Sequence, residues 1–353
     1  MRKVYLIRHA HPDFPLGAHM CLGRTDTPLG PLGRMQALLL GEALKGAALG
    51  AVFSSPLARC RETASPLGLA PQLVEALAEQ DMGPWDGLDF TQIRQGWPEL
   101  YARREAEPLL VPPGAETLPE VQRRVTPAVM AVLRESRGDA AIVAHASVIQ
   151  ALLSAVCGVP LEESRPLRPP YTAYARLVYD GALRLEQEKI LPRVPLTAAL
   201  ASRLLDAAAP GAQVAAHCRA VAAEALRIAS ALPLPLDREL LQSAALLHDV
   251  ARKEKNHAQL GAAWLRELGY EEAARLVEQH HDLENDRLDE AAVLYLADKC
   301  IQETTRVPLE TRFSDSALRC LTEEARAAHA ARLAQTLRLR EAVNQLCGQR
   351  IVM

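Results

Sequence analysis

The chain has 353 residues, a formal net charge of −3 and 49% hydrophobic residues, which is enough apolar material for two ordinary cores. The slightly acidic balance argues against a nucleic-acid-binding surface, and no run of about 20 apolar residues could span a membrane. The seven cysteines form no Cys-x-x-Cys pair, so we expect reduced, mostly buried thiols in a cytoplasmic protein.

The first predicted strand, 4–7, runs directly into Arg8-His9. Open α/β sheets place their chemistry at the carboxyl ends of their strands. A guanidinium can bind phosphate oxygens in a bidentate manner, and a neighbouring histidine can act as a nucleophile. The pair therefore suggests phosphate chemistry, although a strand that merely ends in two polar residues explains it equally well. In the glycine- and proline-rich loop that follows, Arg24 and Thr25 are candidate phosphate contacts, with a solvated loop as the alternative.

Two further strand ends carry polar side chains. A helix is predicted over 36–49, and the short strand 51–54 after it leads into a Ser-Ser-Pro helix start that brings Arg59 back to the same edge. A third apolar strand, 140–144, ends in His145. Three strand ends that converge on such side chains favour a catalytic edge over a chance pattern.

A proton donor is also available in this half of the chain. The loop 77–87 places carboxylates and glycines around a tryptophan. Either Glu79 or Asp81 could act as a general acid, provided that its pKa is raised beside the phosphate.

Four motifs occur in an order that resembles one family. They read Arg-His-Ala, Ser-Ser-Pro-Leu-x-Arg-x-x-x-Thr, Glu-x-x-x-Gly-x-Trp-x-Gly and Ala-His-x-x-Val-Ile. Over residues 1–190 the chain thus resembles the histidine phosphatase superfamily, also called phosphoglycerate mutase-like. Its Gly-Arg-Thr-Asp-x-Pro-Leu and Pro-Pro-Gly-x-Glu-Thr segments look most like the α-ribazole phosphatase branch.

The resemblance implies an α/β three-layer sandwich that works without a metal. His9 would be the nucleophile and form a phosphohistidine, and Glu79 would protonate the leaving alcohol. The other implied residues surround the phosphoryl group or line the substrate side: Arg8, Arg59 and His145 for the former, Arg24 and Thr25 for the latter.

The departures from the family pattern lie around the nucleophile. Ala10 and Ala146 stand where glycines are usual, and Ala10-His11-Pro12 replaces the common Gly-Glu-Thr. These departures bear on the identity of the substrate rather than on the catalysis. His11 is either a substrate contact or a solvated loop residue.

The linker 191–195 separates two kinds of sequence. Before it, 171–179 and 183–190 are predicted strands that complete the first domain, over 1–192. After it, the chain is rich in alanine, leucine, glutamate and arginine, which predicts an all-α domain over 193–312. A helical tail, 313–353, either packs on this domain or pairs between subunits of a homo-oligomer.

A second histidine cluster lies in the helical half. The pair His248-Asp249 ends a buried apolar run, where it would be costly without a positive partner. A divalent ion such as Mn, Fe or Zn supplies that partner, because imidazole and carboxylate together suit such metals. The other members of the cluster are His217, His257, His280, His281 and Asp298.

The order His…His-Asp…Asp resembles the HD-domain metal phosphohydrolases over 197–312. The resemblance implies that His217, His248, Asp249 and Asp298 bind one metal. The extra His257, His280 and His281 resemble the subset with two metals, in which Asp249 bridges. Lys253 could hold phosphate or be solvated. The Gly-Tyr-Pro signature of diguanylate phosphodiesterases is missing, which argues against a cyclic dinucleotide substrate.

The sequence therefore predicts a two-domain phosphohydrolase. The first domain would be a phosphomonoesterase and the second a metal-dependent hydrolase of a phosphate monoester, diester or nucleotide. Two alternatives stay open: a phosphatase regulated by a non-catalytic HD domain that binds a metal or nucleotide, and a phosphoglycerate-type mutase. The expected partner is a small phosphorylated metabolite or nucleotide, with no nucleic acid and no membrane.

Overall fold

The computed structural model describes residues 1–104, 106–318 and 320–352. Its contacts divide the chain into two compact units, Met1–Val194 and Pro195–Met353, which are described separately below. Among the described residues, no helix is both long and apolar enough to cross a membrane.

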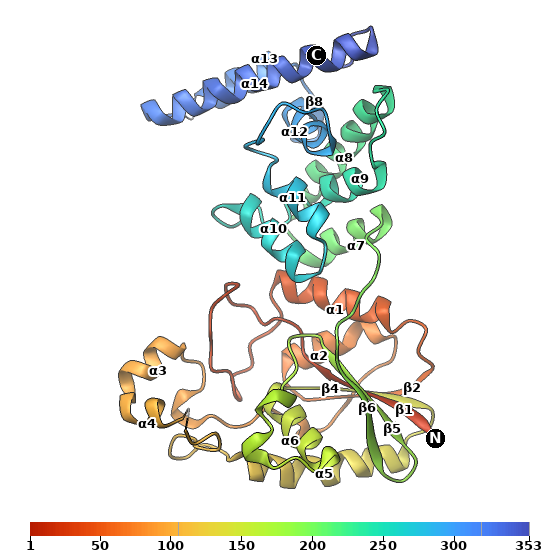
Figure 1. Ribbon diagram of the computed structural model, residues 1–353, viewed down its shortest axis with the longest axis vertical. Helices are drawn as coiled ribbons and strands as arrows, with labels where there is room; N and C mark the ends of the chain where they lie inside the picture. Colours follow the sequence, from red (N-terminus) through yellow and green to blue (C-terminus); the bar gives the residue numbers. More distant parts are fainter. Residues whose placement is uncertain (105, 319, 353) are drawn as a thin grey trace. The chain divides into compact units, whose positions relative to one another are not determined.

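The first unit contains a six-stranded mixed sheet in the order β3-β2-β4-β1-β5-β6 (Figure 1). Strands β1 to β4 run parallel, β5 pairs antiparallel with β1, and the edge strand β6 pairs antiparallel with β5. In the centre, Leu6 of β1 pairs with Ile142 of β4. The strands are β1 (Arg2–Arg8), β2 (Leu49–Ser54), β3 (Gln72–Leu73), β4 (Asp139–Ala144), β5 (Tyr174–Tyr179) and β6 (Leu183–Ile190).

Alternate residues of β1 pack into two different cores. Val4 and Leu6 belong to a core with the buried faces of α5 and α6, whereas Tyr5 and Ile7 belong to a core with α1 and α2. Because successive strand residues point to opposite faces, the sheet is covered by helices on both sides (Figure 1). This confirms the predicted α/β three-layer sandwich. The helices of this unit are α1 (Pro31–Ala43), α2 (Ala58–Ala64), α3 (Phe90–Gly96), α4 (Pro98–Arg103), α5 (Leu118–Glu135) and α6 (Ala146–Cys157).

The first helix differs from the expected 36–49. It begins at Pro31, where proline suits the first helical turn because its missing N–H has no partner there in any case. It ends at Ala43, and Leu49 already belongs to β2. Lys45-Gly46, just after the observed end, is a stop signal that the predicted range did not take into account.

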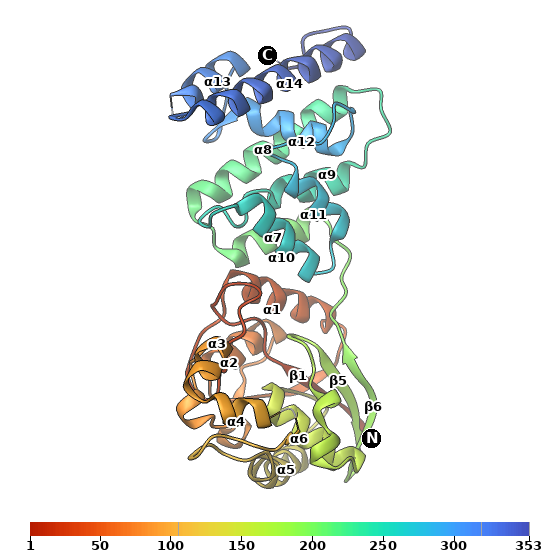
Figure 2. The ribbon, with the colours of Figure 1, turned by 60° about the vertical axis from the view of Figure 1, so that its left-hand side comes forward.

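The second unit is built almost entirely from helices (Figure 2). Helix α12 lies at its centre and is buried on all sides from Ala291 to Cys300. It packs on α8 and α9, and α10 packs on α11. A two-residue hairpin, β7 (Ile301–Gln302) and β8 (Thr305–Arg306), interrupts the helical pattern. The helices are α7 (Ala198–Ala208), α8 (Ala212–Ala231), α9 (Arg238–Leu247), α10 (His257–Glu267), α11 (Glu271–Glu278), α12 (Glu290–Cys300), α13 (Leu309–Ala317) and α14 (Glu323–Cys347).

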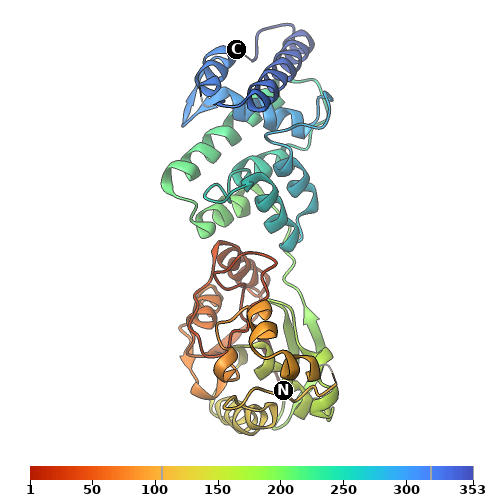
Figure 3. The ribbon, with the colours of Figure 1, turned by 90° about the vertical axis from the view of Figure 1, so that its left-hand side faces the viewer.

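The long helix α14 contacts α12 (Figure 3). The Thr336 hydroxyl donates to the Tyr295 hydroxyl at 3.0 Å, and Tyr295 in turn donates to the carbonyl of Arg332 at 3.2 Å. Leu339 and Val343 of the same helix are buried. This part of α14 therefore packs into the core of the second unit, whereas Leu346 near its end is 48% exposed.

Two candidate functional sites

The first candidate site lies where β1 and β4 end. The backbone N–H of His9 donates to the carbonyl of Ala144 at 3.0 Å, which ties the two strand ends together. The His9 ring is buried, and its Nδ1 lies 2.8 Å from the carbonyl of Ala10. A carbonyl only accepts, so the ring proton lies on Nδ1 and Nε2 keeps its lone pair. This is the tautomer that a nucleophile needs.

The loop that follows His9 is also held in place by α2. The backbone N–H of Ala10 donates to the Thr63 hydroxyl at 2.9 Å, and that hydroxyl donates to the carbonyl of Arg59 at 2.6 Å. Thr63 is the last residue of the Ser-Ser-Pro-Leu-x-Arg-x-x-x-Thr motif. Thr63 therefore connects the loop that follows His9 to α2, the helix that carries Arg59.

Arg8 is positioned by a loop that precedes β5. Its Nη1 donates to the carbonyl of Pro169 at 2.8 Å, and its guanidinium lies 3.9 Å from the centre of the Tyr171 ring. The Tyr171 ring also lies 5.5 Å from the His9 ring. Tyr171 thus forms a wall against both residues, a role that no sequence motif marked.

The centre of the His145 ring lies 5.0 Å from that of the His9 ring, and Nε2 of His145 is 2.7 Å from the Ser55 hydroxyl. Burial, Arg59 and Arg8 hold the pKa of His9 well below its ordinary value. Burial, His9 and Arg59 do the same for the pKa of His145. Both rings are therefore neutral at pH 7.

The low pKa of His9 makes a testable prediction about pH. An ordinary histidine loses its lone pair by protonation near pH 6.5, but His9 stays neutral at this pH because its pKa is depressed. We expect its ring signals, assigned by comparison with His9→Ala, not to titrate between pH 8 and pH 6 in NMR spectra. Only the unfolded chain takes up this proton below about pH 6.5, so acidification also destabilises the fold. A midpoint near 6.5 would contradict the assignment.

Arg59 is fully buried, and both of its terminal nitrogens donate to backbone carbonyls of a neighbouring loop. Its Nη1 donates to the carbonyl of Thr25 at 2.7 Å and its Nη2 to the carbonyl of Gly23 at 2.8 Å, while Nε has no partner. The loop that contains residues 23–25 is held by Asp86. The Asp86 carboxylate accepts from the backbone N–H groups of Gly23, Arg24 and Thr25 at 2.7, 2.7 and 2.8 Å. The Trp-Asp-Gly sequence was the only signal for this function of Asp86.

The two candidate acids have different surroundings. Glu79 is buried, and its carboxylate accepts from the backbone N–H groups of Gln80 at 2.8 Å and Ser147 at 3.4 Å. Asp81 is exposed, and it accepts from the backbone N–H of Gly83 at 2.8 Å within its own turn. Glu79 faces the cavity described next, and Asp81 is absent from the lining of that cavity.

A cavity of about 250 Å³ opens beside the His9 ring, and Arg8, His9 and Glu79 line it. The predicted site residues Arg59, His145, Arg24 and Thr25 are not part of its lining. Arg24 is 40% exposed and lies 3.8 Å from the Glu116 carboxylate. The sequence missed several residues that do line it, because no motif marks them: Ser147, Gln150, Arg104, Arg165, Arg168 and Tyr171.

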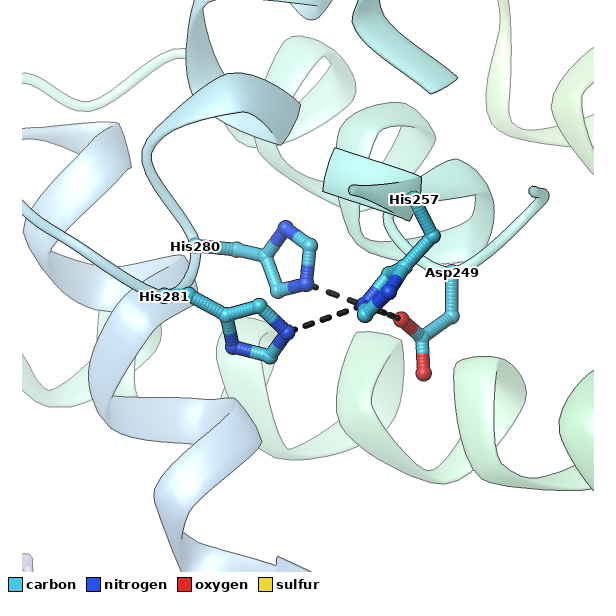
Figure 4. A group of neighbouring side chains, drawn as sticks. All are labelled: Asp249, His257, His280 and His281. Carbon is cyan, nitrogen blue, oxygen red and sulfur yellow. Dashed lines mark hydrogen bonds and ion pairs between the residues drawn. The ribbon is translucent and has the colours of Figure 1, made fainter. Parts of the chain in front are cut away.

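The second candidate site is the histidine and aspartate cluster of the other unit. Four side chains offer ligand atoms that all lie within 4.8 Å of one another: Asp249, His257, His280 and His281 (Figure 4). A second such group consists of His217, His248 and Asp249. Only Asp249 belongs to both groups.

Backbone carbonyls orient three of these rings. The Nδ1–H groups of His217, His248 and His280 donate to the carbonyls of Glu303, Ala245 and Val277 at 2.8, 2.8 and 2.6 Å. A ring held in this way presents the lone pair of Nε2 toward the cluster when it is neutral, the form in which histidine binds a metal. The Nε2 atoms of His248 and His280 and the Oδ1 of Asp249 are buried without a hydrogen-bond partner. Buried nitrogen and oxygen atoms without a hydrogen-bond partner are suitable ligand atoms for a divalent metal ion.

The two oxygens of Asp249 face different ligand groups. Oδ1 lies 3.1 Å from Nε2 of His257 and 3.6 Å from Nε2 of His280, whereas Oδ2 lies 3.8 Å from Nε2 of His248. His257 and His281 approach each other with Nε2 atoms 2.9 Å apart. A carboxylate with this arrangement can bridge two ions.

Asp298 comes from the central helix α12 toward the second group. Its Oδ1 lies 3.2 Å from Nε2 of His217 and 3.6 Å from Nε2 of His248, and its Oδ2 accepts from Lys299 Nζ at 2.8 Å. Burial opposes its ionisation, but Lys299, His217 and His248 hold its pKa well below the ordinary value. Asp298 is therefore an ionised carboxylate at pH 7.

Lys253, a predicted phosphate contact, is exposed. Its neighbour Arg252 instead faces the cluster, with Nη1 2.8 Å from Nε2 of His257 and 3.7 Å from Oδ1 of Asp249. The chain from His248 to Asn256 forms turns rather than a helix, so helical spacing does not decide which side chain faces the cluster.

Comparisons with known families agree with both units. Residues 4–186 match the model of the histidine phosphatase superfamily (branch 1), and residues 214–302 match that of the HD domain. The chain belongs to the histidine phosphatase superfamily and carries an HD domain after the phosphatase region. With these two domains and relatives named as phosphatases, the protein is a phosphatase or phosphohydrolase.

Relatives with different named substrates resemble the first unit. Phosphoserine phosphatase 1 of Hydrogenobacter thermophilus is 31% identical over 46% of this chain and 80% of its own length. Glucosyl-3-phosphoglycerate phosphatase of Mycobacterium tuberculosis is 30% identical over 45% of this chain and 77% of its own. A structure from Escherichia coli K-12 assigned as an α-ribazole-5′-phosphate phosphatase has a TM-score of 0.50 at 21% identity, covering 55% of this chain and 98% of its own, and shows the fold alone.

Proposed function

We propose that the first unit hydrolyses a small phosphomonoester through a phosphohistidine at His9. The supporting observation is the tautomer of His9, whose Nε2 lone pair is free beside a cavity that Arg8 and Glu79 also line. Nε2 attacks phosphorus, Arg8 binds equatorial oxygens, and Glu79 gives a proton to the leaving oxygen. Water then attacks the phosphohistidine, and Glu79 accepts the proton of that water. In this proposal Arg59 and the neutral His145 also surround the phosphoryl group, and Arg24 and Thr25 lie on its substrate side.

The relatives support a small metabolite as the substrate. Their names specify phosphoserine and glucosyl-3-phosphoglycerate, which are both small phosphorylated compounds. A phosphoglycerate-type mutase would use the same nucleophile but transfer the phosphoryl group to a second alcohol. Release of inorganic phosphate, rather than transfer to phosphoglycerate, distinguishes the phosphatase from the mutase.

The proton donor makes a prediction that depends on the leaving group. Glu79→Gln cannot donate a proton, so we expect its kcat/KM to fall by about 10²–10³-fold for an alkyl phosphate such as glycerol 3-phosphate. The loss should be about tenfold or less for 4-nitrophenyl phosphate, because nitrophenolate leaves without a proton. The matched control is Asp81→Asn, which changes the exposed alternative acid. Equal losses of Glu79→Gln on both substrates would contradict the role of Glu79 as the acid.

For the second unit we infer a metal-dependent phosphohydrolase of a phosphate monoester, diester or nucleotide. His217, His248, Asp249 and Asp298 would hold one divalent ion, and His257, His280 and His281 would hold a second with Asp249. A bound ion would polarise a phosphoryl oxygen and lower the pKa of a coordinated water. The hydrogen bonds from Nδ1 of His217, His248 and His280 to backbone carbonyls turn the Nε2 atoms of these rings toward the cluster. Arg252 offers a cation for a phosphate oxygen. Lys253 stays a more distant candidate for the same role.

One experiment on the full chain tests both proposals together. Phosphate release from 4-nitrophenyl phosphate should survive EDTA and disappear in His9→Ala. Hydrolysis of bis(4-nitrophenyl) phosphate should need Mn²⁺, Fe²⁺ or Zn²⁺ and disappear in Asp249→Ala. If metal removal only changes the kinetics of the first reaction, the HD domain is a regulator and not an enzyme. This scheme assigns 1–192 to the phosphatase, 193–312 to the HD domain and 313–353 to a tail that packs on it.

A further inference from the structure

The cavity beside His9 carries more positive charge than the proposed reaction uses. Besides Arg8, three arginines line it, and among the described residues of its lining Glu79 is the only carboxylate. Within the described parts of the chain, none of the three forms an ion pair with a carboxylate. We call them the arginine wall: Arg104, Arg165 and Arg168.

Arg168 lies beside the proton donor. Its Nη2 donates to the Ser147 hydroxyl at 3.0 Å, and the backbone N–H of Ser147 donates to the Glu79 carboxylate at 3.4 Å. Glu79 serves the leaving oxygen in the proposed reaction. The part of the substrate that is attached to this oxygen must therefore lie next to Ser147 and Arg168.

The other two arginines come from separate segments. Arg104 follows α4, and its guanidinium carbon lies 5.4 Å from the centre of the Phe90 ring and 5.9 Å from that of Trp85. Aromatic faces hold a guanidinium in place without neutralising it. Arg165 begins the short helical turn Arg165–Leu167 and is exposed. Two chain segments, one after α4 and one over 165–168, thus bring cations to one cavity.

The charges in the cavity are poorly balanced. Arg168 is exposed. The protein atoms around it nevertheless lower its pKa; the Glu79 carboxylate opposes this effect, while Arg8, Arg104 and Arg165 add to it. Like charges that repel one another in a partly dehydrated space are relieved when an anion binds among them. Guanidinium groups are well suited to carboxylate and phosphate oxygens, because their planar donors match both.

We propose that the arginine wall binds a second anionic group of the substrate. The inference rests on the proposed phosphatase activity and refines it: the preferred substrate is a small phosphomonoester whose alcohol part carries a carboxylate or another phosphate. The phosphoryl group lies against His9 and Arg8, and the second anion lies against Arg168, Arg104 and Arg165.

The test uses three substrates with the same three-carbon skeleton. They are 3-phosphoglycerate, glycerol 1,3-bisphosphate and glycerol 3-phosphate, whose far ends are a carboxylate, a phosphate and a neutral hydroxyl. The full chain should show a kcat/KM at least about tenfold higher for an anionic far end, as expected for a charge-assisted hydrogen bond. The first two compounds also show which anion the wall prefers.

The Arg168→Met variant should lose that preference, with kcat/KM about tenfold lower for the preferred anionic substrate and within about twofold for glycerol 3-phosphate. Arg165→Met is a second variant in the same direction, and its exposed position makes misfolding a poor explanation. The matched control is Arg103→Met. Arg103 lies next to the wall in sequence but pairs with Glu107 at 2.8 Å and is absent from the cavity lining. It should retain the preference.

Two negative outcomes have different meanings. Hydrolysis of glycerol 3-phosphate that depends on His9, without any preference for an anionic far end, overturns the arginine wall and leaves the phosphatase intact. The same holds if Arg168→Met loses activity equally on all three substrates, because Arg168 then acts only through Ser147 and Glu79. If neither glycerol 3-phosphate nor 4-nitrophenyl phosphate is hydrolysed, the proposed function itself fails.

Discussion

His9→Ala should hydrolyse phosphomonoesters at least about 10⁴-fold more slowly than the parent chain, which is the scale of loss when a covalent nucleophile is removed. The reason lies in the local geometry. The Ala10 carbonyl keeps the ring proton on Nδ1, so Nε2 is a base without a proton beside Arg8 and Glu79. Among the described residues that line the cavity, His9 is the only histidine, so no other lining side chain offers a neutral imidazole lone pair beside Arg8 and Glu79.

The measurement is the release of inorganic phosphate from 4-nitrophenyl phosphate, together with a rapid quench in alkaline denaturant after the protein has been mixed with radiolabelled substrate. The parent should trap an acid-labile, base-stable phosphoryl group, and His9→Ala should trap none. His19→Ala is the matched control, because His19 is an exposed histidine of the same unit. A His9→Ala variant that keeps more than a tenth of the parent rate would refute the covalent mechanism.

The catalytic edge could be predicted from sequence because it depends on short-range patterns. Apolar strands that run parallel bring their carboxyl ends together, so Arg8, His9 and His145 converge once 4–8 and 140–144 are recognised as neighbouring strands. The same logic fails for a loop, whose path is set by distant contacts. The sequence could not separate Glu79 from Asp81, because the N–H of Ser147, from another helix, is what holds Glu79.

The arginine wall and Tyr171 were missed for the same reason. They lie in irregular segments before β5 and after α4, where no periodicity predicts the direction of a side chain. Arg59 shows a further limit. Its motif predicts the position at the sheet edge, but not that the carbonyls of Gly23 and Thr25 take up its donors. Long-range packing decides such partners, and a single sequence does not record it.

In the HD domain, the resemblance implied that Asp249 bridges two metals, but it did not say which of its oxygens faces which histidine. The spacing of His248-Asp249 within a buried run indicated a metal, because a buried charge needs a partner. Which oxygen of Asp249 faces which histidine depends on how α9, α10 and α11 pack together. The structure shows Oδ1 toward His257 and His280 and Oδ2 toward His248, and this division leads to the second main prediction.

Asp249→Ala should lose two metal equivalents rather than one. A carboxylate whose oxygens face separate histidine groups contributes to both ions, so its removal weakens both sites, by about 100-fold or more if each loses a charged ligand. The measurement is metal content by mass spectrometry after the full chain has been loaded with Mn²⁺ or Fe²⁺ and dialysed. The parent should retain two equivalents and Asp249→Ala none, while His281→Ala, changed only in one group, should retain one.

The matched control for this loss is Asp282→Ala. Asp282 follows the His280-His281 pair directly, but its carboxylate is 66% exposed and accepts two hydrogen bonds from Arg332, at 2.7 and 3.0 Å. It should retain two equivalents, which separates loss of a ligand from loss of a nearby charge. If Asp249→Ala keeps one tightly held ion, Asp249 is not a bridge, and His257, His280 and His281 only surround a site that holds a single metal. If the parent itself holds no ion after loading, the catalytic proposal for this domain fails, and the histidine phosphatase remains as the single enzyme of the chain.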